Sequence, residues 1–292
     1  MAQGTDSRSA RRSVVSRWVG DPDIGGAYSY LRPGGTSADR DALAVEVLAR
    51  VWLAGEYTWS AGPGTLHGAW FSGERAAAAV LERHELQRIA VIGSGMAGIG
   101  AAHLLHGSGR EAEIFESSAR PFGRAATDRS VGGPIHSPDT HVTLDFANRP
   151  SETFDAVICA TPLPPIKTRR IVFDPPIPDA IATSMNRIGC GPIAKVVTTF
   201  DEPFWAPHRS FSLTGPEPQP LEFFVDVSTV VGQATLCGFA VGEHAAAVEA
   251  MAEDEKCFLV DRLLTDAGVR NFSSQGSDNT DDPDSERPVR FP

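Results

Sequence analysis

The distribution of apolar and polar residues predicts a regular order of elements around residues 88–116. Residues 89–92 are a short apolar run typical of a buried strand, and three glycines follow within residues 93–98. Residues 99–106 have helical spacing, and residues 112–115 favour a second strand. A strand, a glycine turn, a helix and another strand together predict a βαβ unit.

Elements upstream of this unit follow from the same reasoning. Residues 50–54 form a compact apolar run closed by Gly55, which favours a buried strand. A helix is expected from Thr65, as its N-cap, to Glu82. Residues 39–49 favour a short helix or turn.

Downstream of the βαβ unit the pattern changes to strands with few helices. Residues 141–146 and 154–160 predict a pair of strands, and the proline-rich residues 161–165 predict a stiff crossing segment. Strand-like runs between proline and glycine turns recur over residues 171–240 and predict an antiparallel sheet, followed by one helix over residues 244–264. The fold class is therefore α/β, with a Rossmann-like domain and a smaller α+β domain.

Composition narrows the class of protein without identifying it. The 37 acidic and 26 basic residues give a net charge of −11, which argues against a nucleic-acid-binding surface. The four cysteines form no CxxC and the eight histidines form no HExxH, so we expect free thiols and no metal. No apolar run reaches the about 18 residues of a membrane span, and no apolar segment typical of a secretory signal follows the N-terminal arginines. We therefore expect a cytoplasmic protein with no membrane partner.

The glycine turn carries the first candidate chemistry. It has the pattern G-x-G-x-x-G, formed by Gly93, Gly95 and Gly98, and Glu116 ends the next strand. The first glycine permits a tight turn, the second lets the backbone approach a pyrophosphate, and the third lets helix and strand pack closely. Free N–H groups at the helix start favour phosphate, and Glu116 is expected to accept hydrogen bonds from ribose hydroxyls. The turn therefore predicts a dinucleotide site, without separating FAD from NAD.

The residues that follow resemble a segment of flavin enzymes. Residues 116–124 read ESSARPFGR and resemble the E-x-x-x-R-x-G-G-R segment of the flavin-containing amine oxidase family. This family comprises monoamine oxidases, polyamine oxidases and flavin-dependent histone lysine demethylases. The resemblance implies a GR2-type FAD domain in which Arg124 approaches the FAD phosphates and Arg120 flanks the adenosine half. Phe122 stands where the family has the first glycine of G-G-R.

A second block resembles the family's C-terminal signature. Residues 54–76 contain AGEYT and GTLHGAWFSGERA, similar to the family's A-G-E-x-T and T-V-H-G-A segments. The resemblance implies that Gly55 and Glu56 contact the ribityl part of FAD, and that Thr65 and Leu66 start a helix facing the flavin ring. Free N–H groups at a helix start stabilise the negative charge of reduced flavin.

A third block supplies one wall of the expected substrate site. Residues 18–30 read WVGDPDIGGAYSY and resemble the family's W-x-x-D-x-x-x-x-G-x-Y-S segment. The resemblance implies that Tyr28 is one wall of an aromatic cage before the flavin, with Thr65 at the opposite wall. Ala27 stands where some monoamine oxidases have the cysteine that holds FAD covalently, so FAD is expected to bind non-covalently.

A fourth block, residues 159–205, resembles the family's central segment and contains GCGPIAKVVTTF. In that segment a lysine hydrogen-bonds through a water to flavin N5, and Lys195 matches it. A lysine in an apolar strand otherwise extends to solvent or pairs with an acid. The resemblance thus makes Lys195 the most specific catalytic candidate.

The order and size of the blocks differ from the family's pattern. The blocks of residues 14–83 precede the glycine turn instead of ending the chain, which implies a circular permutation, and only residues 125–139 replace a long helical insert that forms much of the substrate cavity. Chain ends of a domain tend to lie close together, which makes such a permutation feasible. The expected organisation is an FAD-domain segment at residues 14–86, a second FAD-binding segment at residues 87–164 and a substrate domain at residues 165–270. Residues 1–13 and 272–292 are expected to be flexible tails.

The implied activity is FAD-dependent oxidation of an amine, with Lys195, Tyr28 and Thr65 as the catalytic residues. Hydride passes from the α-carbon of the amine to flavin N5, the imine hydrolyses, and O2 is reduced to H2O2. Two alternatives stay open: an amino-acid oxidase or other desaturating flavoenzyme, and a flavin-binding remnant that needs a partner. The partners expected are a small amine, O2, and a homo-oligomer or a subunit that completes the pocket.

Overall fold

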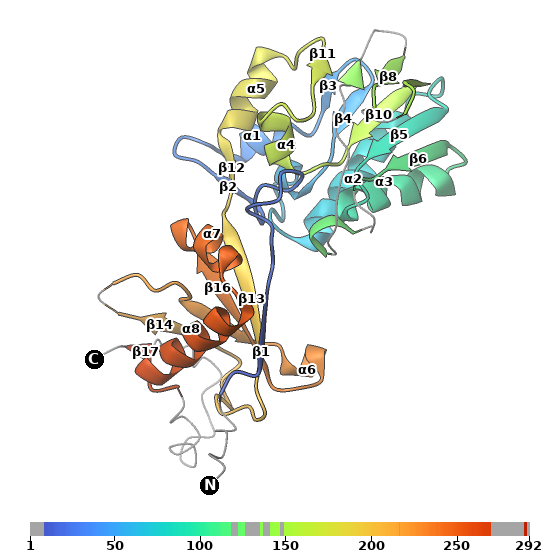
Figure 1. Cartoon of the computed structure of the whole chain (residues 1–292). Helices are drawn as coiled ribbons and strands as arrows, with labels where there is room; N and C mark the ends of the chain where they lie inside the picture. The colour runs from blue at the N-terminus through green and yellow to red at the C-terminus, as the bar shows by residue number, and fades with distance from the viewer. Residues whose placement is uncertain are drawn as a thin grey trace. The chain divides into compact units, whose positions relative to one another are not determined.

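The structure is a computed structural model in which the chain divides into two units (Figure 1). One unit comprises residues Asp21–Gly191, and the second combines Met1–Gly20 with Pro192–Pro292. The residues described are 9–117, 122–125, 135–136, 141–146, 149–215, 217–269 and 289–290.

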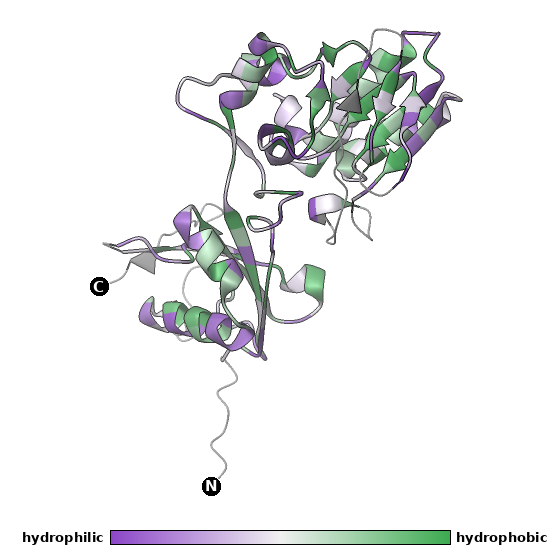
Figure 2. Cartoon of the chain, turned by 45° about the horizontal axis from the view of Figure 1, so that its top comes forward, coloured by the Kyte–Doolittle hydropathy of each residue, from purple (hydrophilic) through white to green (hydrophobic). Residues whose placement is uncertain are grey.

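A five-stranded sheet with the order β3-β4-β10-β5-β6 organises the unit of residues 21–191. Its strands are Glu46–Leu48 (β3), Val51–Leu53 (β4), Ala156–Cys159 (β10), Arg88–Ile92 (β5) and Glu111–Phe115 (β6). The last four are parallel, and β3 is antiparallel to β4. Strands that are buried on both faces read as continuous apolar runs, as in β4 and β10, whose residues are all buried. Figure 2 shows hydrophobic residues among the strands of this unit.

Two helices, Leu66–Leu81 (α2) and Met96–Gly107 (α3), pack against each other beside this sheet (Figure 1). Glycines bring their backbones together. A Cβ built on Gly73 would lie 1.9 Å from the carbonyl oxygen of Ala97, and one on Gly100 would lie 2.7 Å from that of Trp70. The helix predicted from Thr65 to Glu82 and the βαβ unit are confirmed, and α2 packs directly on α3, the helix of that unit.

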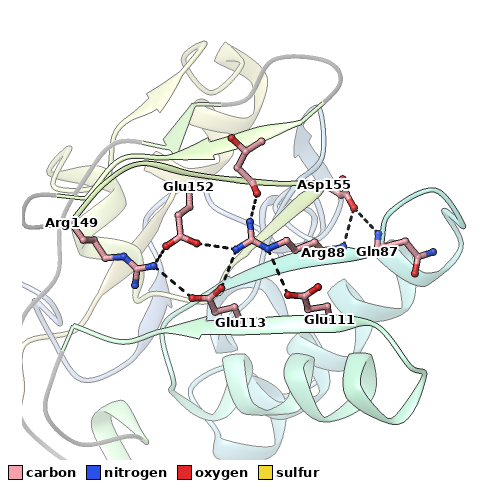
Figure 3. A network of polar contacts seen from close by, with 8 residues as sticks. Gln87, Arg88, Glu111, Glu113, Arg149, Glu152 and Asp155 are labelled. Atoms are coloured by element: carbon pink, nitrogen blue, oxygen red, sulfur yellow. Dashed lines mark hydrogen bonds and ion pairs between the residues drawn. The ribbon is translucent and has the colours of Figure 1, made fainter.

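A four-stranded sheet in the same unit has the order β11-β7-β8-β9. Its strands are Phe173–Asp174 (β11), Ile135–His136 (β7), Val142–Leu144 (β8) and Glu152–Phe154 (β9). Charged side chains join β9 to the parallel sheet: Figure 3 shows Arg88 between the carboxylates of Glu111, Glu113 and Glu152. The guanidinium also lies 4.2 Å from the ring centroid of Phe154.

Shorter elements complete this unit. The strands Ser29–Leu31 (β2) and Ile188–Cys190 (β12) form an antiparallel pair. The helices are Ser37–Asp41 (α1), Glu56–Thr58 (η1), Gly123–Ala125 (η2), Leu163–Lys167 (α4) and Asp179–Asn186 (α5). Residues 165–191 therefore pack with the parallel sheet, although the sequence placed them in the substrate domain.

The second unit is built on a six-stranded, mainly antiparallel sheet with the order β1-β13-β16-β15-β14-β17. Its strands are Arg12–Val15 (β1), Ile193–Thr199 (β13), Thr235–Val241 (β16), Phe223–Asp226 (β15), Ser210–Thr214 (β14) and Val289–Arg290 (β17). Its helices are Ser228–Val231 (α6), Glu243–Ala250 (α7) and Glu253–Asp266 (α8). Residues of β13, β16, α7 and α8 share one hydrophobic core. The predicted antiparallel sheet is confirmed.

Three local expectations differ from the structure. The predicted strand 154–160 is interrupted: Phe154 ends β9 and Ala156 begins β10. Asp155 separates them and accepts hydrogen bonds from the N–H groups of Gln87 and Arg88, both at 2.9 Å. The crossing segment 161–165 enters α4, whose prolines lie in the first turn, where no intrahelical N–H is needed. The single helix 244–264 is two helices: Met251 is extended, and the N–H of Ala252 bonds to Glu255 at 2.7 Å.

The N-terminal boundary also differs. Arg12 and Ser13, expected in a flexible tail, lie in β1 and pair with β13, and the Ser13 hydroxyl bonds to that of Thr198 at 2.7 Å. This pairing assigns residues 14–20 to the unit with the antiparallel sheet, although the sequence placed them in the FAD domain. Residues 1–8 and most of 272–292 lie outside the described residues.

Candidate functional site

The glycine turn has the geometry expected of a close backbone approach. Gly93 has φ of +98°, in the region that favours glycine. A Cβ on Gly98 would lie 1.8 Å from the carbonyl oxygen of Gly93, so any side chain there would separate the helix from the strand. Gly95 is the N-cap of α3, and a Cβ built on it meets no heavy atom of the described residues within 4 Å. On the side where a Gly95 side chain would project, no described residue covers the backbone at the helix start.

Glu116 lies beside this turn at the end of β6. Its Oε2 accepts hydrogen bonds from the N–H of Ser94 at 2.7 Å and from its hydroxyl at 2.5 Å. These bonds orient the carboxylate at the carboxyl ends of β5 and β6, where ligands bind in parallel α/β sheets. Glu116 and the three glycines are thus brought together as the sequence predicted.

The loop after β4 adds a second carboxylate. Gly55 has φ of 154°, and its N–H donates to the Ser72 hydroxyl of α2 at 2.8 Å. Glu56 follows and is only 5% exposed. Its carboxylate accepts hydrogen bonds from the N–H and hydroxyl of Ser29, at 2.9 and 2.7 Å, and from the N–H of Gly64 at 2.7 Å. Several charge-assisted bonds offset the cost of burying this charge.

Arg124 connects the two parts of the site. Its guanidinium donates to the carbonyl of Ala27 and lies 3.8 Å from Glu56 Oε1. The preceding residue, Gly123, lies against the glycine turn: a Cβ built on it would be 3.4 Å from the Cα of Gly95. Gly123 has φ of +54°, which suits a glycine in this close approach.

A buried arginine, Arg40, and a partly buried one, Arg75, hold the Glu56 loop, and neither was predicted from the sequence. Arg40, 3% exposed, donates to the Ser29 hydroxyl at 2.6 Å and to the carbonyl of Tyr57 at 3.2 Å. Arg75 donates to the carbonyls of Leu53 and Thr58, both at 2.8 Å, and burial lowers the pKa of Arg75 to about 10. Arg75 is part of the quoted SGERA segment, whereas nothing in the local sequence distinguishes Arg40 from an exposed arginine.

Thr65 has a structural position at the start of α2. Its hydroxyl accepts from the N–H of Gly68 at 3.0 Å, which caps the helix, and donates to the carbonyl of Gly62 at 2.6 Å in the preceding loop. Leu66, the next residue, is 62% exposed. The ring of Tyr28 lies beside Gly64, 3.5 Å from a Cβ built there, and partial burial raises the pKa of Tyr28. Tyr28 and the helix start are therefore neighbours.

Lys195 belongs to the second unit, in the centre of β13. Its Nζ lies 5.4 Å from the ring centroid of Trp18 and 5.5 Å from that of Phe239. Its role toward a flavin stays a prediction, and Arg120 lies outside the described residues. Within the residues that the structure describes, no helix has the length and apolarity of a membrane span, and no cluster of three potential metal ligands occurs.

The parallel sheet, the glycine turn at its carboxyl edge and Glu116 define a dinucleotide-binding fold of the Rossmann type. The sequence profile of a NAD(P)-binding Rossmann-like domain matches residues 91–154, and that of the flavin containing amine oxidoreductases matches residues 4–81 and 133–285. The chain belongs to the flavin containing amine oxidoreductase family.

Curated relatives match over short segments. A lysine-specific histone demethylase 1 homolog 2 of Oryza sativa is 43% identical over 74 residues, which are 25% of this chain and 10% of that protein. Polyamine oxidase 4 of Oryza sativa is 28% identical over 130 residues, 43% of this chain and 27% of that protein. The chain thus spans about a tenth to a quarter of these relatives.

Among solved structures, a triple mutant of putrescine oxidase matches with a TM-score of 0.40 and 16% identity, over 62% of this chain and 37% of that one. Cyclohexylamine oxidase from Brevibacterium oxydans matches with a TM-score of 0.38 and 19% identity, over 58% and 34%.

The residues present fit FAD, the cofactor of this family. The clearance at Gly95 leaves room for a pyrophosphate at the start of α3, and Glu116 has the position of a ribose acceptor. Glu56 offers a buried carboxylate beside the start of α2. These groups belong to one unit and come from segments on both sides of the glycine turn in sequence.

Proposed function

We propose that this chain is an FAD-dependent oxidase of amines. The observation that carries the proposal is the convergence of Arg124 on Glu56, with Gly123 against Gly95. This arrangement joins the AGE segment to the dinucleotide turn in a chain of the flavin containing amine oxidoreductase family. A Rossmann turn used for NAD alone needs no such second block.

The roles of the chain's residues follow from their chemistry. Gly93, Gly95 and Gly98 and the start of α3 bind the pyrophosphate, Glu116 accepts from ribose hydroxyls, and Arg124 neutralises phosphate charge. Gly55 and Glu56 hold the ribityl chain, and α2 begins with Thr65 and Leu66 facing the flavin ring.

Bound FAD supplies the two-electron acceptor for hydride from the α-carbon of the amine, and O2 then accepts the electrons and becomes H2O2. Tyr28 orients the neutral amine, with Thr65 at the opposite wall. Lys195 holds a water by hydrogen bonding, and water hydrolyses the imine product. Because Ala27 has no thiol, FAD is held without a covalent link, and acid precipitation leaves the yellow colour in the supernatant.

The organisation of the chain is part of the proposal. We infer that the motif order is a circular permutation of the family's order. The antiparallel unit that carries Lys195 is then a shortened substrate domain. The packing of α2 on α3 supports the permutation. It places the block of residues 54–76 beside the dinucleotide turn, although this block comes first in sequence.

An aerobic screen of amines and amino acids tests the proposal, with peroxide and the flavin spectrum recorded together. Amines should bleach the flavin under anaerobic conditions and yield peroxide in air. If amino acids are oxidised and amines are not, the chain is an amino-acid oxidase instead. A yellow protein that no compound reduces would contradict independent activity and indicate a subunit that needs a partner.

A further inference from the structure

The ammonium of Lys195 lies between two aromatic rings. Its Nζ is 5.4 Å from the ring centroid of Trp18 and 5.5 Å from that of Phe239, which pairs with Lys195 across β13 and β16. Among the described residues no carboxylate forms an ion pair with it. Aromatic faces attract a cation through their quadrupoles. The charge is therefore held without an acidic partner.

This environment leaves the hydrogen-bonding capacity of the ammonium available. An ammonium has three N–H donors and no acceptor. A carboxylate partner would take one or two of these donors and neutralise the charge, whereas a ring face takes none of them as a directional bond. An ammonium held in this way is positioned by its surroundings and can still donate to a small polar ligand such as water.

Strand pairing brings Trp18 close to Lys195. The N–H of Ser16 donates to the carbonyl of Lys195 at 3.0 Å, and the N–H of Lys195 donates to the Ser16 hydroxyl at 2.9 Å. These bonds continue the β1–β13 pairing beyond Val15. They end two residues before Trp18, so a further interaction must determine where the indole lies.

Glu249 on α7 supplies that interaction. The carboxylate, 8% exposed, accepts hydrogen bonds from the N–H groups of Trp18 at 2.8 Å, Val19 at 3.1 and 3.2 Å, and Gly20 at 3.2 Å. Successive backbone N–H groups that converge on one anion form a concave binding nest. Here the anion is a side chain of the same unit, and it fixes the backbone that carries the indole.

We propose that Glu249 is a positioning residue that holds Trp18 against Lys195, so that Trp18 and Phe239 form an aromatic clamp for a lysine with free N–H donors. The use of that lysine at the flavin rests on the proposed function, whereas the clamp itself does not. Glu249 acts through the backbone of residues 18–20, and Trp18 and Phe239 act through their ring faces.

The chain has three lysines, Lys167, Lys195 and Lys256, which makes a direct test practical. The full-length protein is labelled with 13C-lysine, and the side-chain signals are assigned with Lys195→Met. Ring currents of Trp18 and Phe239 should shift the Lys195 Hε signals upfield of their positions in a solvated lysine. Trp18→Leu and Phe239→Leu should each remove part of this shift, and neither alters the carboxylate of Glu249.

Glu249→Gln is the decisive variant, because it keeps the size of the side chain and removes its charge. It should move the Lys195 signals toward those of a solvated lysine and leave Lys167 unshifted. Glu243→Gln, an exposed position on the same helix, is the matched control and should change nothing. Unchanged Lys195 signals in a folded Glu249→Gln protein would overturn the positioning role, and unchanged signals in Trp18→Leu would overturn the clamp.

A second readout separates this inference from the proposed function. Reoxidation of the reduced flavin should slow in Glu249→Gln by a smaller factor than in Lys195→Met. If Lys195→Met reoxidises at the wild-type rate while the Lys195 signals still respond to Glu249→Gln, the flavin role of Lys195 fails and the clamp stands. If Lys195→Met is slow while Glu249→Gln leaves the signals unchanged, the clamp fails and the flavin role stands.

Discussion

The hydroxyl of Ser29 donates to Glu56 Oε2 at 2.7 Å, and Ser29 Oγ in turn accepts a hydrogen bond from Arg40 Nη1 at 2.6 Å. Ser29 therefore forms a hydrogen-bond relay between the guanidinium of Arg40 and the carboxylate of Glu56. Burial lowers the pKa of Arg40, and the nearby Glu56 counteracts that effect. The arginine and the carboxylate, 3% and 5% exposed, thus compensate each other in a buried part of the unit.

Replacing Arg40 by methionine tests this relay. Arg40→Met keeps an apolar stem but leaves the Ser29 hydroxyl and the Tyr57 carbonyl without their donor, so we expect a loss of about 2–3 kcal/mol in the free energy of unfolding. Flavin content should fall as well, because Glu56 loses its orientation. Urea unfolding and the visible spectrum measure the two effects. The exposed Arg32→Met is the control, and equal losses in both variants would contradict the relay.

The packing of α2 on α3 predicts opposite effects of two glycine replacements. Gly73→Ala places a Cβ against the backbone of Ala97, so the helices must separate, at a cost of about 1–3 kcal/mol. Gly107→Ala, at the end of α3, meets no described atom within 4 Å and should be neutral or stabilise by up to about 1 kcal/mol. Thermal unfolding of both variants measures the difference. A stable Gly73→Ala protein would mean that the helices are not in close contact.

Asp155 predicts a pH dependence of stability. Burial alone would raise the pKa of Asp155, but the N–H groups of Arg88 and Gln87 and the positive charges of Arg50 and Arg88 outweigh it, so folding lowers the pKa. A carboxyl with a lowered folded pKa stabilises the protein above its unfolded pKa, and the contribution is lost as the pH falls through the folded value.

Asp155→Asn should therefore lower the free energy of unfolding by about 1–2 kcal/mol at neutral pH. The difference from the wild type should shrink below about pH 4, where the aspartate is protonated in the unfolded chain. Urea unfolding over a pH series measures this trend. Asp266→Asn, at an exposed position, serves as the control. A difference that is constant with pH would show that packing, and not charge, causes the effect.

Lys195 carries the most specific catalytic prediction. Lys195→Met keeps the length and apolar stem of the side chain and removes its donors, so folding and flavin binding should survive. Reoxidation of dithionite-reduced flavin by O2 should slow about tenfold or more, which corresponds to about 1.4 kcal/mol of barrier. Stopped-flow absorbance follows the reaction and needs no known substrate. Arg262→Met removes an exposed charge from the same unit and should have no effect, whereas a wild-type rate in Lys195→Met would remove the lysine from the oxygen-reactive site.

Local sequence determined the elements whose signals are short-range. The apolar run 89–92, the three glycines and Glu116 lie within one βαβ unit, so spacing alone predicted the turn and its carboxylate. Thr65 as the N-cap of α2 was predicted for the same reason, because a cap bonds within its own first turn. The resemblance added Glu56 and Arg124, and in the structure Arg124 Nη1 lies 3.8 Å from Glu56 Oε1.

Only the tertiary structure decided which distant residues meet. Glu249 accepts from the backbone of Trp18 across 231 positions, and Arg40 is buried because α1 turns it toward Ser29. Periodicity reports which face of an element is apolar, but not which other element covers that face. The same limit explains why the boundary of the two units and the break at Met251 were missed. Each depends on hydrogen bonds and packing between segments whose spatial proximity is decided by the path of the whole chain.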